Sequence, residues 1–127
     1  RTLYRREPNG EISEVASVPY DGQADDPLFA RIRFLWGLHL DAQDNVYVAD
    51  PPFRRMLRIA PDGTQSVVLT AEAPWFPTAA YRRGGVVYVQ EFATDDRGTS
   101  GPRIRQVLPD GSVHLVGDLD TLIARSR

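Results

Sequence analysis

The chain has 127 residues, 42% of them hydrophobic and 25% charged, which is ordinary for one soluble globular domain. Its formal net charge is −2, so it lacks the basic surplus of a surface that binds nucleic-acid phosphates. It contains no cysteine, which excludes a disulfide framework and a cysteine nucleophile, and it has no apolar run long enough to span a membrane.

The N-terminal residues 1–18 hold two short apolar runs on either side of the turn formers Pro8-Asn9-Gly10. This pattern predicts a hairpin that corresponds to the last two strands of a larger unit. Residues 19–34 carry Asp25-Asp26-Pro27, which favours a turn. We expect a long connection there, with one short apolar anchor at Leu28-Phe29.

Residues 35–70 contain four apolar runs, and turn-forming residues divide each run from the next. Asp44-Asn45 is expected to close the first hairpin and Pro61-Asp62-Gly63 the third, because these residues accept the backbone angles that tight turns require. Two prolines in Asp50–Arg55 cannot donate to a strand ladder, so this stretch predicts a loop. The apolar runs are Gly37–Asp41, Val46–Ala49, Met56–Ala60 and Ser66–Leu69. The unit therefore predicts a four-stranded antiparallel meander.

The same pattern restarts in residues 71–117. Tyr47-Val48 recurs as Tyr88-Val89, 41 residues later, and a fixed period of this size is typical of repeat architectures. We expect the two tyrosines to occupy matching places. The polar, glycine-rich residues 92–101 predict a long loop between the second and third strands. The strands are predicted at Thr78–Tyr81, Val86–Glu91, Arg103–Leu108 and Ser112–Val116. Residues 118–127 are either a tail or the start of a further unit.

The residues of the central unit resemble the NHL repeat. They match its glycine-apolar-x-apolar-aspartate strand, its asparagine-apolar-tyrosine-apolar-alanine-aspartate strand and its proline-aspartate-glycine turn. The matching stretches are Trp36–Asp41, Asp44–Asp50, Leu57–Ile59 and Pro61–Gly63. The match is weaker over residues 78–111, where Gln90-Glu91 replaces the alanine-aspartate pair.

This resemblance implies an all-β chain built of β-propeller blades, each a four-stranded antiparallel meander. Residues 1–18 would form a half blade, 19–34 a connection, and 35–70 and 71–117 two full blades. NHL propellers usually have six blades, and six blades of this size need about 250 residues. We therefore expect either the remaining blades of a longer chain or a second copy, as a homo-oligomer, to cover the outer faces.

In the propellers that this chain resembles, ligands meet the end of the blade that carries the loop after the second strand. The candidate ligand-binding residues are Trp36, His39, Asp50, Phe53, Trp75, Glu91 and Phe92. Exposed aromatic rings beside carboxylates suit recognition of a peptide, a protein or a small ligand. His39, whose counterpart by the period of 41 is Ala80, could serve as a base or ligand, or as a hydrogen-bonded filler.

Structural alternatives exist for several of these residues. Trp36 and Phe76 also fit packing between blades, and Asp50 fits a cap on the backbone amides of the loop that follows it. If Asp50 and Glu91 converged on the central channel, their oxygens could hold a divalent cation such as Ca²⁺.

Three functional classes follow. The first is a binding module for a protein, peptide or small ligand. The second is part of a propeller hydrolase, lactonase or lyase with a divalent metal in its channel, and the third is a structural segment without a ligand. Propeller folds host all three. The resemblance alone favours a secreted or periplasmic location.

Overall fold

The computed structural model describes residues 1–20 and 33–118, and within these ranges the chain is all-β. The N-terminal hairpin consists of β1 (Thr2–Arg6) and β2 (Ile12–Ser17). The central sheet consists of β3 (Trp36–Leu40), β4 (Val46–Asp50), β5 (Arg55–Ile59) and β6 (Gln65–Thr70). The C-terminal sheet consists of β7 (Trp75–Arg83), β8 (Val86–Asp95), β9 (Gly98–Val107) and β10 (Val113–Asp118).

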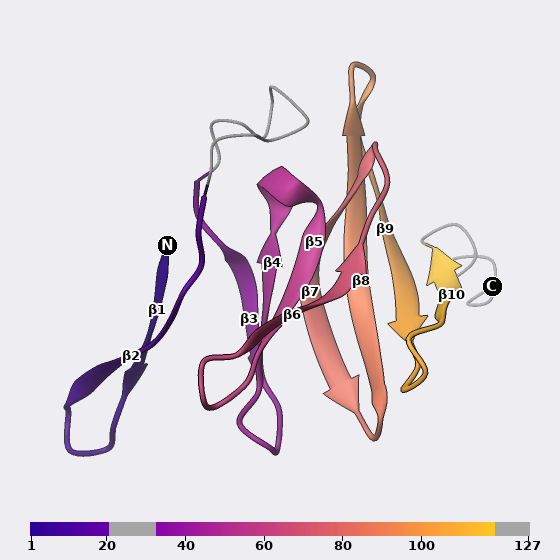
Figure 1. Cartoon of the computed structure of the whole chain (residues 1–127). Coiled ribbons are helices and arrows are strands. Elements are labelled where there is room, and N and C mark those ends of the chain that lie inside the picture. The colour runs from indigo at the N-terminus through magenta and orange to yellow at the C-terminus, as the bar shows by residue number, and fades with distance from the viewer. Residues whose placement is uncertain (21–32, 119–127) are drawn as a thin grey trace.

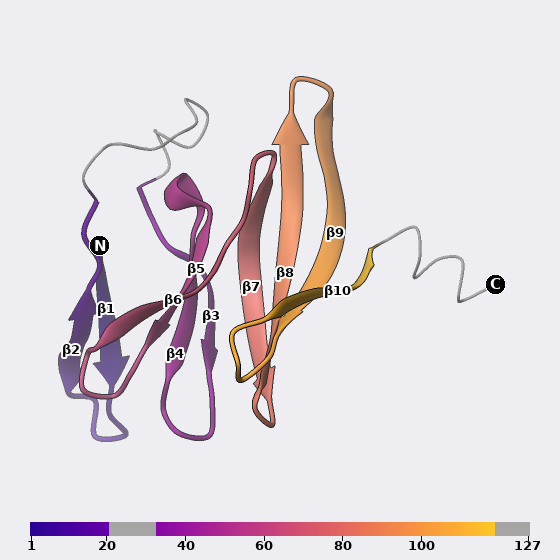
Figure 2. The same ribbon diagram turned by 45° about the vertical axis from the view of Figure 1, so that its right-hand side comes forward.

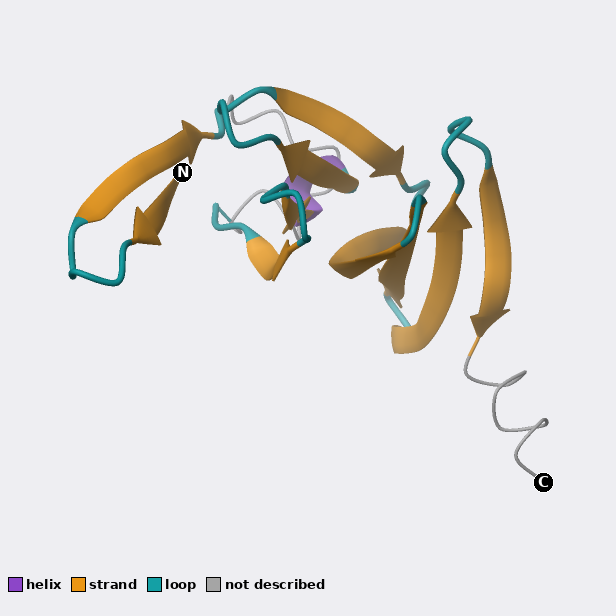
Figure 3. Ribbon diagram, turned by 90° about the horizontal axis from the view of Figure 1, so that it is seen from below, coloured by secondary structure: helices purple, strands orange, loops and turns teal. Residues whose placement is uncertain are grey.

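Both four-stranded sheets are antiparallel meanders in which strands pair in chain order, as the sequence predicts. The hairpin, the central sheet and the C-terminal sheet stand next to one another in that order (Figures 1 and 3). This arrangement is compatible with the blades of a propeller. The predicted anchor Leu28-Phe29 and residues 119–127 lie outside the described residues.

One turn design closes the outer hairpin of all three sheets. Gly10, Gly63 and Gly111 have φ of +90°, +87° and +85°, and each amide donates to the carbonyl three residues earlier at 2.8–2.9 Å. The residue before each glycine is Asn or Asp, and its side chain accepts a bond from the backbone amide two residues later at 2.9–3.0 Å. This local chemistry explains why the repeat is legible in the sequence.

The core lies between the sheets. Strand β4 is buried along its whole length because both of its faces are covered. Val46 and Val48 point to the interface with the N-terminal hairpin, while Tyr47 and Ala49 point to the interface with the C-terminal sheet. The hairpin contributes Leu3, Ala16 and Val18 to the first interface, and the C-terminal sheet contributes Val87, Val89 and Val107 to the second.

The predicted loop over residues 92–101 is wrong. Strands β8 and β9 run through it and pair Ala93 with Ser100, Thr94 with Thr99 and Asp95 with Gly98. The added residues therefore lengthen a hairpin, and its turn projects beyond the neighbouring loops (Figure 2). Polar residues can form this hairpin because much of it is exposed, so the strands need no buried face.

Strand β7 also begins earlier than predicted, at Trp75 instead of Thr78. Trp75, Phe76 and Pro77 pair with the extended part of β8, and a bulge between Pro77 and Ala79 restores the register. The proline is accommodated because β7 lies at the edge of its sheet.

The N-terminal hairpin corresponds to the third and fourth strands of the other sheets. A bulge falls between Leu3 and Tyr4 in β1, and the matching bulge falls between Met56 and Leu57 in β5. Strands β5 and β9, however, have neighbours on both sides, whereas β1 pairs only with β2 among the described strands. Within residues 1–20 and 33–118, the edge of β1 that faces away from β2 is therefore unpaired and open.

Candidate functional site

The sheets have two distinct ends. The turn end carries the β1–β2, β3–β4, β5–β6, β7–β8 and β9–β10 turns, and the loop end carries the short 3-10 helix η2 (Pro51–Phe53), the β6–β7 connection and the β8–β9 turn (Figure 1). Six of the seven candidate residues lie toward the loop end, while His39 lies farther along β3.

Asp50 is fully buried at the end of β4, and its carboxylate is bound by two arginines. Arg1 donates Nη2 to Oδ2 at 3.1 Å, and Arg55 donates Nε to the same oxygen at 2.9 Å. The expected cap on the following loop is wrong, because Asp50 makes no side-chain hydrogen bond to η2. The first two residues of η2 are prolines, which have no amide hydrogen to donate.

Glu91 takes the corresponding place in the C-terminal sheet and is also fully buried. Arg103 donates Nη2 to its Oε2 at 2.8 Å, and Arg105 donates Nη2 to the same oxygen at 3.2 Å. The Arg103 guanidinium also stacks 4.0 Å from the centroid of the Trp75 ring. Asp50 lies opposite Arg55 on the paired strand, and Glu91 lies opposite Arg103 in the same way. The two sheets therefore place a carboxylate beside an arginine at the same position, with aspartate in one sheet and glutamate in the other.

Two arginines, Arg1 and Arg54, connect neighbouring sheets at the loop end. Arg1 and Arg54 occupy matching places in their sheets. The Arg1 carbonyl accepts a hydrogen bond from the Val18 amide, and the Arg54 carbonyl accepts one from the Ala71 amide, both at 2.7 Å. Arg1 reaches across to Asp50, and Arg54 reaches across to the carbonyl of Trp75 at 2.9 Å. These bonds tie each sheet to the one that follows it.

The aromatic candidates divide between the interface and the surface of the loop end. Trp36 contacts Phe76 edge to face at a centroid distance of 6.0 Å, and Phe76 is buried, so both take part in packing between sheets. Phe53 is half-buried beneath the Arg55 guanidinium at 4.8 Å. Phe92 is half-buried on the face of β8 opposite to Glu91.

His39 lies in β3 opposite Tyr47, and its ring contacts the tilted ring of Tyr81 in the C-terminal sheet at a centroid distance of 4.9 Å. Its counterpart by strand pairing is Tyr81, because Tyr81 pairs with Tyr88 as His39 pairs with Tyr47. Its Nε2 is buried and has no hydrogen-bond partner among the described residues. His39 therefore packs between aromatic rings.

The candidates thus form two separate arginine–carboxylate clusters, one around Asp50 and one around Glu91. No three His, Asp or Glu side chains are gathered in metal-binding geometry within residues 1–20 and 33–118. Both carboxylates already accept hydrogen bonds from arginines, and this gives each a structural role. That the seven residues bind a ligand stays a prediction.

Sequence reasoning missed a polar network at the turn end. Asp41 accepts hydrogen bonds from the amides of Gln43 and Asn45 at 2.9 Å, from the Tyr47 hydroxyl at 3.2 Å and from Arg82 Nη1 at 2.8 Å. Burial alone would raise the pKa of Asp41, but Arg82, the Asn45 side chain and the backbone amides outweigh it and hold that pKa well below its ordinary value. The Asp41 bond to Arg82 joins the central and C-terminal sheets.

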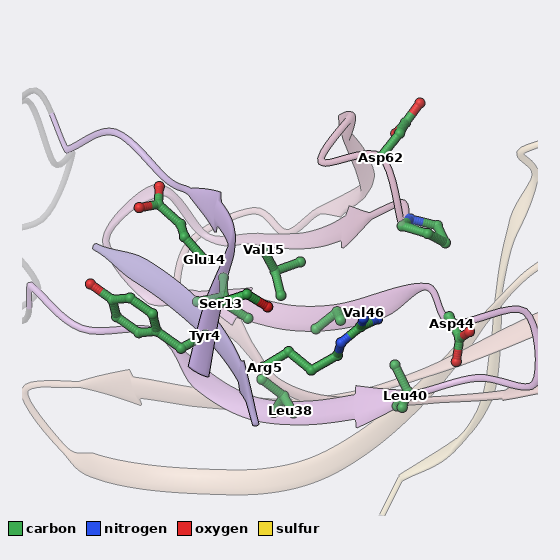
Figure 4. Close-up of a pocket in the computed structure, with 12 residues that line it drawn as sticks. Tyr4, Arg5, Ser13, Glu14, Val15, Leu38, Leu40, Asp44, Val46 and Asp62 are labelled. Atoms are coloured by element: carbon green, nitrogen blue, oxygen red, sulfur yellow. The ribbon is translucent and has the colours of Figure 1, made fainter. Parts of the chain in front are cut away.

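It also missed a groove beside the open edge of β1, which we call the edge groove. This cavity of about 380 Å³ has an apolar lining formed by Leu3, Val15, Leu38, Leu40 and Val46 (Figure 4). A second cavity of about 650 Å³ shares Leu3, Tyr4 and Leu38 with it and extends past Trp36. Leu38 and Leu40 are 66% and 55% exposed, and both belong to β3, an edge strand of the central sheet.

Comparison with the C-terminal sheet explains this exposure. Leu40 pairs with Val46 as Arg82 pairs with Val87, so Leu40 and Arg82 occupy corresponding places in the two sheets. There β3 and β4 lie against β7, whereas among the described strands the N-terminal hairpin has no counterpart of β3 and β4 that could lie against β3. The only feature of the sequence that pointed to this groove was the N-terminal unit, which is predicted to have two strands where the others have four.

The part of the chain that the structure describes contains no helix that is long and apolar enough to cross a membrane. Comparison of the chain with protein-family models, with curated proteins and with solved structures finds no match.

Proposed function

We propose that the chain is a segment of an NHL-type propeller that acts as an interaction module and binds a protein or peptide at the edge groove. The bound segment would be extended and would add to the sheet at β1. In such strand addition, main-chain hydrogen bonds supply affinity, while pockets for alternate side chains supply specificity.

The open edge of β1 carries this proposal. In the other two sheets the strands that correspond to β1 are β5 and β9. Their corresponding edges are paired, β5 with β4 and β9 with β8. An unpaired strand edge presents a row of backbone donors and acceptors that readily pairs with another chain. Here the edge also borders an apolar cavity, so an added strand would bury side chains as well as pair its backbone.

A labelled copy of residues 77–91, the β7–β8 hairpin of this protein, tests the proposal as a 15-residue peptide. Titrated with the full chain and followed by fluorescence anisotropy, it should bind with a dissociation constant of about 100 µM or tighter. Replacing both Leu38 and Leu40 by Gln should weaken binding by about tenfold or more, since each leucine would be buried by the peptide.

Leu115→Gln is the matched control, because Leu115 is 59% exposed but lies in β10, in a different sheet. This variant should bind the peptide as the wild type does. Binding absent at about 1 mM, or lost equally in the control, would refute the edge groove as the site.

A further inference from the structure

We infer that a second groove of this protein binds a small organic carboxylate with an apolar body. The groove lies between the exit from β2 and the outer strands of the central sheet, and we call it the outer groove. It is a cavity of about 360 Å³ whose lining includes Pro19, Phe53, Arg55, Leu57, Gln65 and Val67. Its strands are β5 and β6, whereas the strands of the edge groove are β1 to β4, so this inference goes beyond the function proposed above.

The outer groove does not involve the unpaired edge of β1. Pro19, which follows β2, forms one wall, and the paired strands β5 and β6 form the other. Gln65 at the start of β6 donates Nε2 to the carbonyl of Ser17 in β2 at 2.7 Å, and this bond joins the two walls. The groove is therefore a feature of the contact between two neighbouring sheets.

Comparison with the C-terminal sheet explains why the outer groove has an apolar surface. Leu57 lies opposite Val67 as Arg105 lies opposite Leu115, so Leu57 and Arg105 occupy corresponding places in the two sheets. Arg105 donates Nη2 to Glu91 Oε2 at 3.2 Å. Leucine carries no polar group, so the central sheet has an apolar surface where the C-terminal sheet has a guanidinium bound to a carboxylate.

The charge of the outer groove favours an anion. Among the described residues that line it, Arg55 is the only one with a charged side chain, and this side chain is 29% exposed. Arg55 donates Nε to Asp50 Oδ2 at 2.9 Å, and Arg1 donates Nη2 to the same oxygen at 3.1 Å. Two guanidinium groups thus meet one carboxylate, which leaves one positive charge in surplus.

Arg55 also has hydrogen-bond donors left for a ligand. Its Nε and Nη2 bind Asp50, and a guanidinium carries five N–H donors in total. The edge formed by Nη1 and the second hydrogen of Nη2 can hold a carboxylate through two parallel hydrogen bonds. The Phe53 ring, whose centroid lies 4.8 Å from the Arg55 guanidinium, helps to fix the orientation of this edge.

The apolar body of the ligand would lie along β5 and β6. Arg55 and Leu57 are alternate residues of β5 and share one face of the sheet, and Val67 pairs with Leu57. Val67 is 52% exposed and Phe53 is half-buried, so a ligand bound to Arg55 would remove apolar surface of both from water. The cavity volume lies within the range of about 300–1,000 Å³ that is usual for sites that bind small molecules.

The experiment uses phenylbutyrate as the probe and its neutral amide as the matched ligand. Titrated into the full chain and followed by amide NMR spectra, phenylbutyrate should cause saturable shifts at Arg55, Leu57 and Val67 with a dissociation constant of about 2 mM or tighter. The neutral amide should bind at least about fivefold more weakly, because it lacks the charge that pairs with Arg55. This comparison leaves the Asp50 cluster unaltered, so it does not depend on whether an Arg55 variant folds.

Val67→Glu should weaken phenylbutyrate binding at least about fivefold and binding of the amide less than about twofold, because the added carboxylate repels only the anion. Leu115→Glu makes the same change of charge at the corresponding place of the C-terminal sheet and should leave both affinities unchanged. Equal affinities for the acid and the amide would overturn the inference, as would an equal loss in Leu115→Glu. No saturable shift up to about 20 mM, or shifts at Leu38 and Leu40 in place of Arg55 and Val67, would also overturn it. Peptide binding at the edge groove is a separate measurement, so either proposal can fail alone.

Discussion

Replacing Gly37 by alanine should strongly destabilise the contact between the central and C-terminal sheets. Gly37 has φ of +55°, and a Cβ built there would stand 2.0 Å from the carbonyl oxygen of Thr78 and 3.1 Å from Ala79 Cα. Those atoms belong to the backbone of β7, so they cannot rotate away. The variant must either separate the sheets or distort β3.

Gly84→Ala isolates the part of this cost that comes from the backbone angle. Gly84 has a similar φ of +61°, but a Cβ there would meet no heavy atom within 4 Å. Alanine in the left-handed region costs roughly 1–2 kcal/mol at either position. Forcing packed elements apart typically adds about 1–3 kcal/mol, so we expect Gly37→Ala to lose about 2 kcal/mol more than Gly84→Ala.

Urea unfolding at pH 7, followed by tryptophan fluorescence, measures the two variants. Trp36 and Trp75 are the two tryptophans of the chain, and both lie near this contact. The reduction in unfolded-state entropy on changing Gly to Ala is common to both variants and cancels in the comparison. Free energies of unfolding that agree within about 0.5 kcal/mol would refute the close approach of β3 and β7.

Four further outcomes follow from the buried polar groups. Asp41→Asn should lower the free energy of unfolding in urea by about 3 kcal/mol, because its new amide group would face the donors that bind the carboxylate. Asp44→Asn, in the exposed part of the same turn, is the control and should lower it by less than about 0.5 kcal/mol. Since the pKa of Asp41 in the folded state lies below its ordinary value of 3.8, its contribution is fully present above that pH and should be lost as the pH falls further; a profile unchanged by Asp41→Asn would contradict this. Tyr47→Phe removes a hydrogen bond to Asp41 and should cost about 1 kcal/mol, while Tyr88→Phe should stay within about 0.5 kcal/mol in the same assay. Glu91→Gln leaves two arginines without their carboxylate and should lower the free energy of unfolding by about 3 kcal/mol; a loss under 1 kcal/mol would argue against the buried cluster.

The arginine–carboxylate clusters give the loop end a structural task. Arg1 binds Asp50 across the first interface, and Arg54 binds the Trp75 carbonyl across the second, so adjacent sheets are held together where apolar burial ends. Charged hydrogen bonds of this kind are directional, and they fix the relative position of the sheets more closely than apolar contacts alone. The loop end, where the sequence places the candidate ligand-binding residues, is thus held together by hydrogen bonds between neighbouring sheets.

Features that depend on a few neighbouring residues were predictable from sequence. The three glycine turns and the meander of the central sheet were correct because turn chemistry and strand alternation act over short stretches. The loop predicted over residues 92–101 was wrong because its structure depends on pairing between two strands. The polar residues there indicate that the segment is exposed, but they do not prevent β8 and β9 from pairing as a hairpin.

Tyr47 and Tyr88 show most directly what the sequence repeat could and could not predict. Both pair with the first strand of their own sheet, at the matching place that the period of 41 residues predicts. Yet Tyr47 is 1% exposed and Tyr88 is only half-buried, because the C-terminal sheet covers the first and no described strand covers the second. The repeat determined the position, and the neighbouring sheet determined the surroundings.

The amino-acid sequence by itself therefore determined the class of fold, the meanders and the turns, since these are set by local backbone preferences and by the alternation of apolar residues. Only the tertiary structure decided that Asp50 and Glu91 are bound by arginines, that Asp41 joins two sheets and that Leu38 and Leu40 line an open groove. Each of these depends on groups from different strands meeting in space, and no local pattern encodes which strand lies opposite.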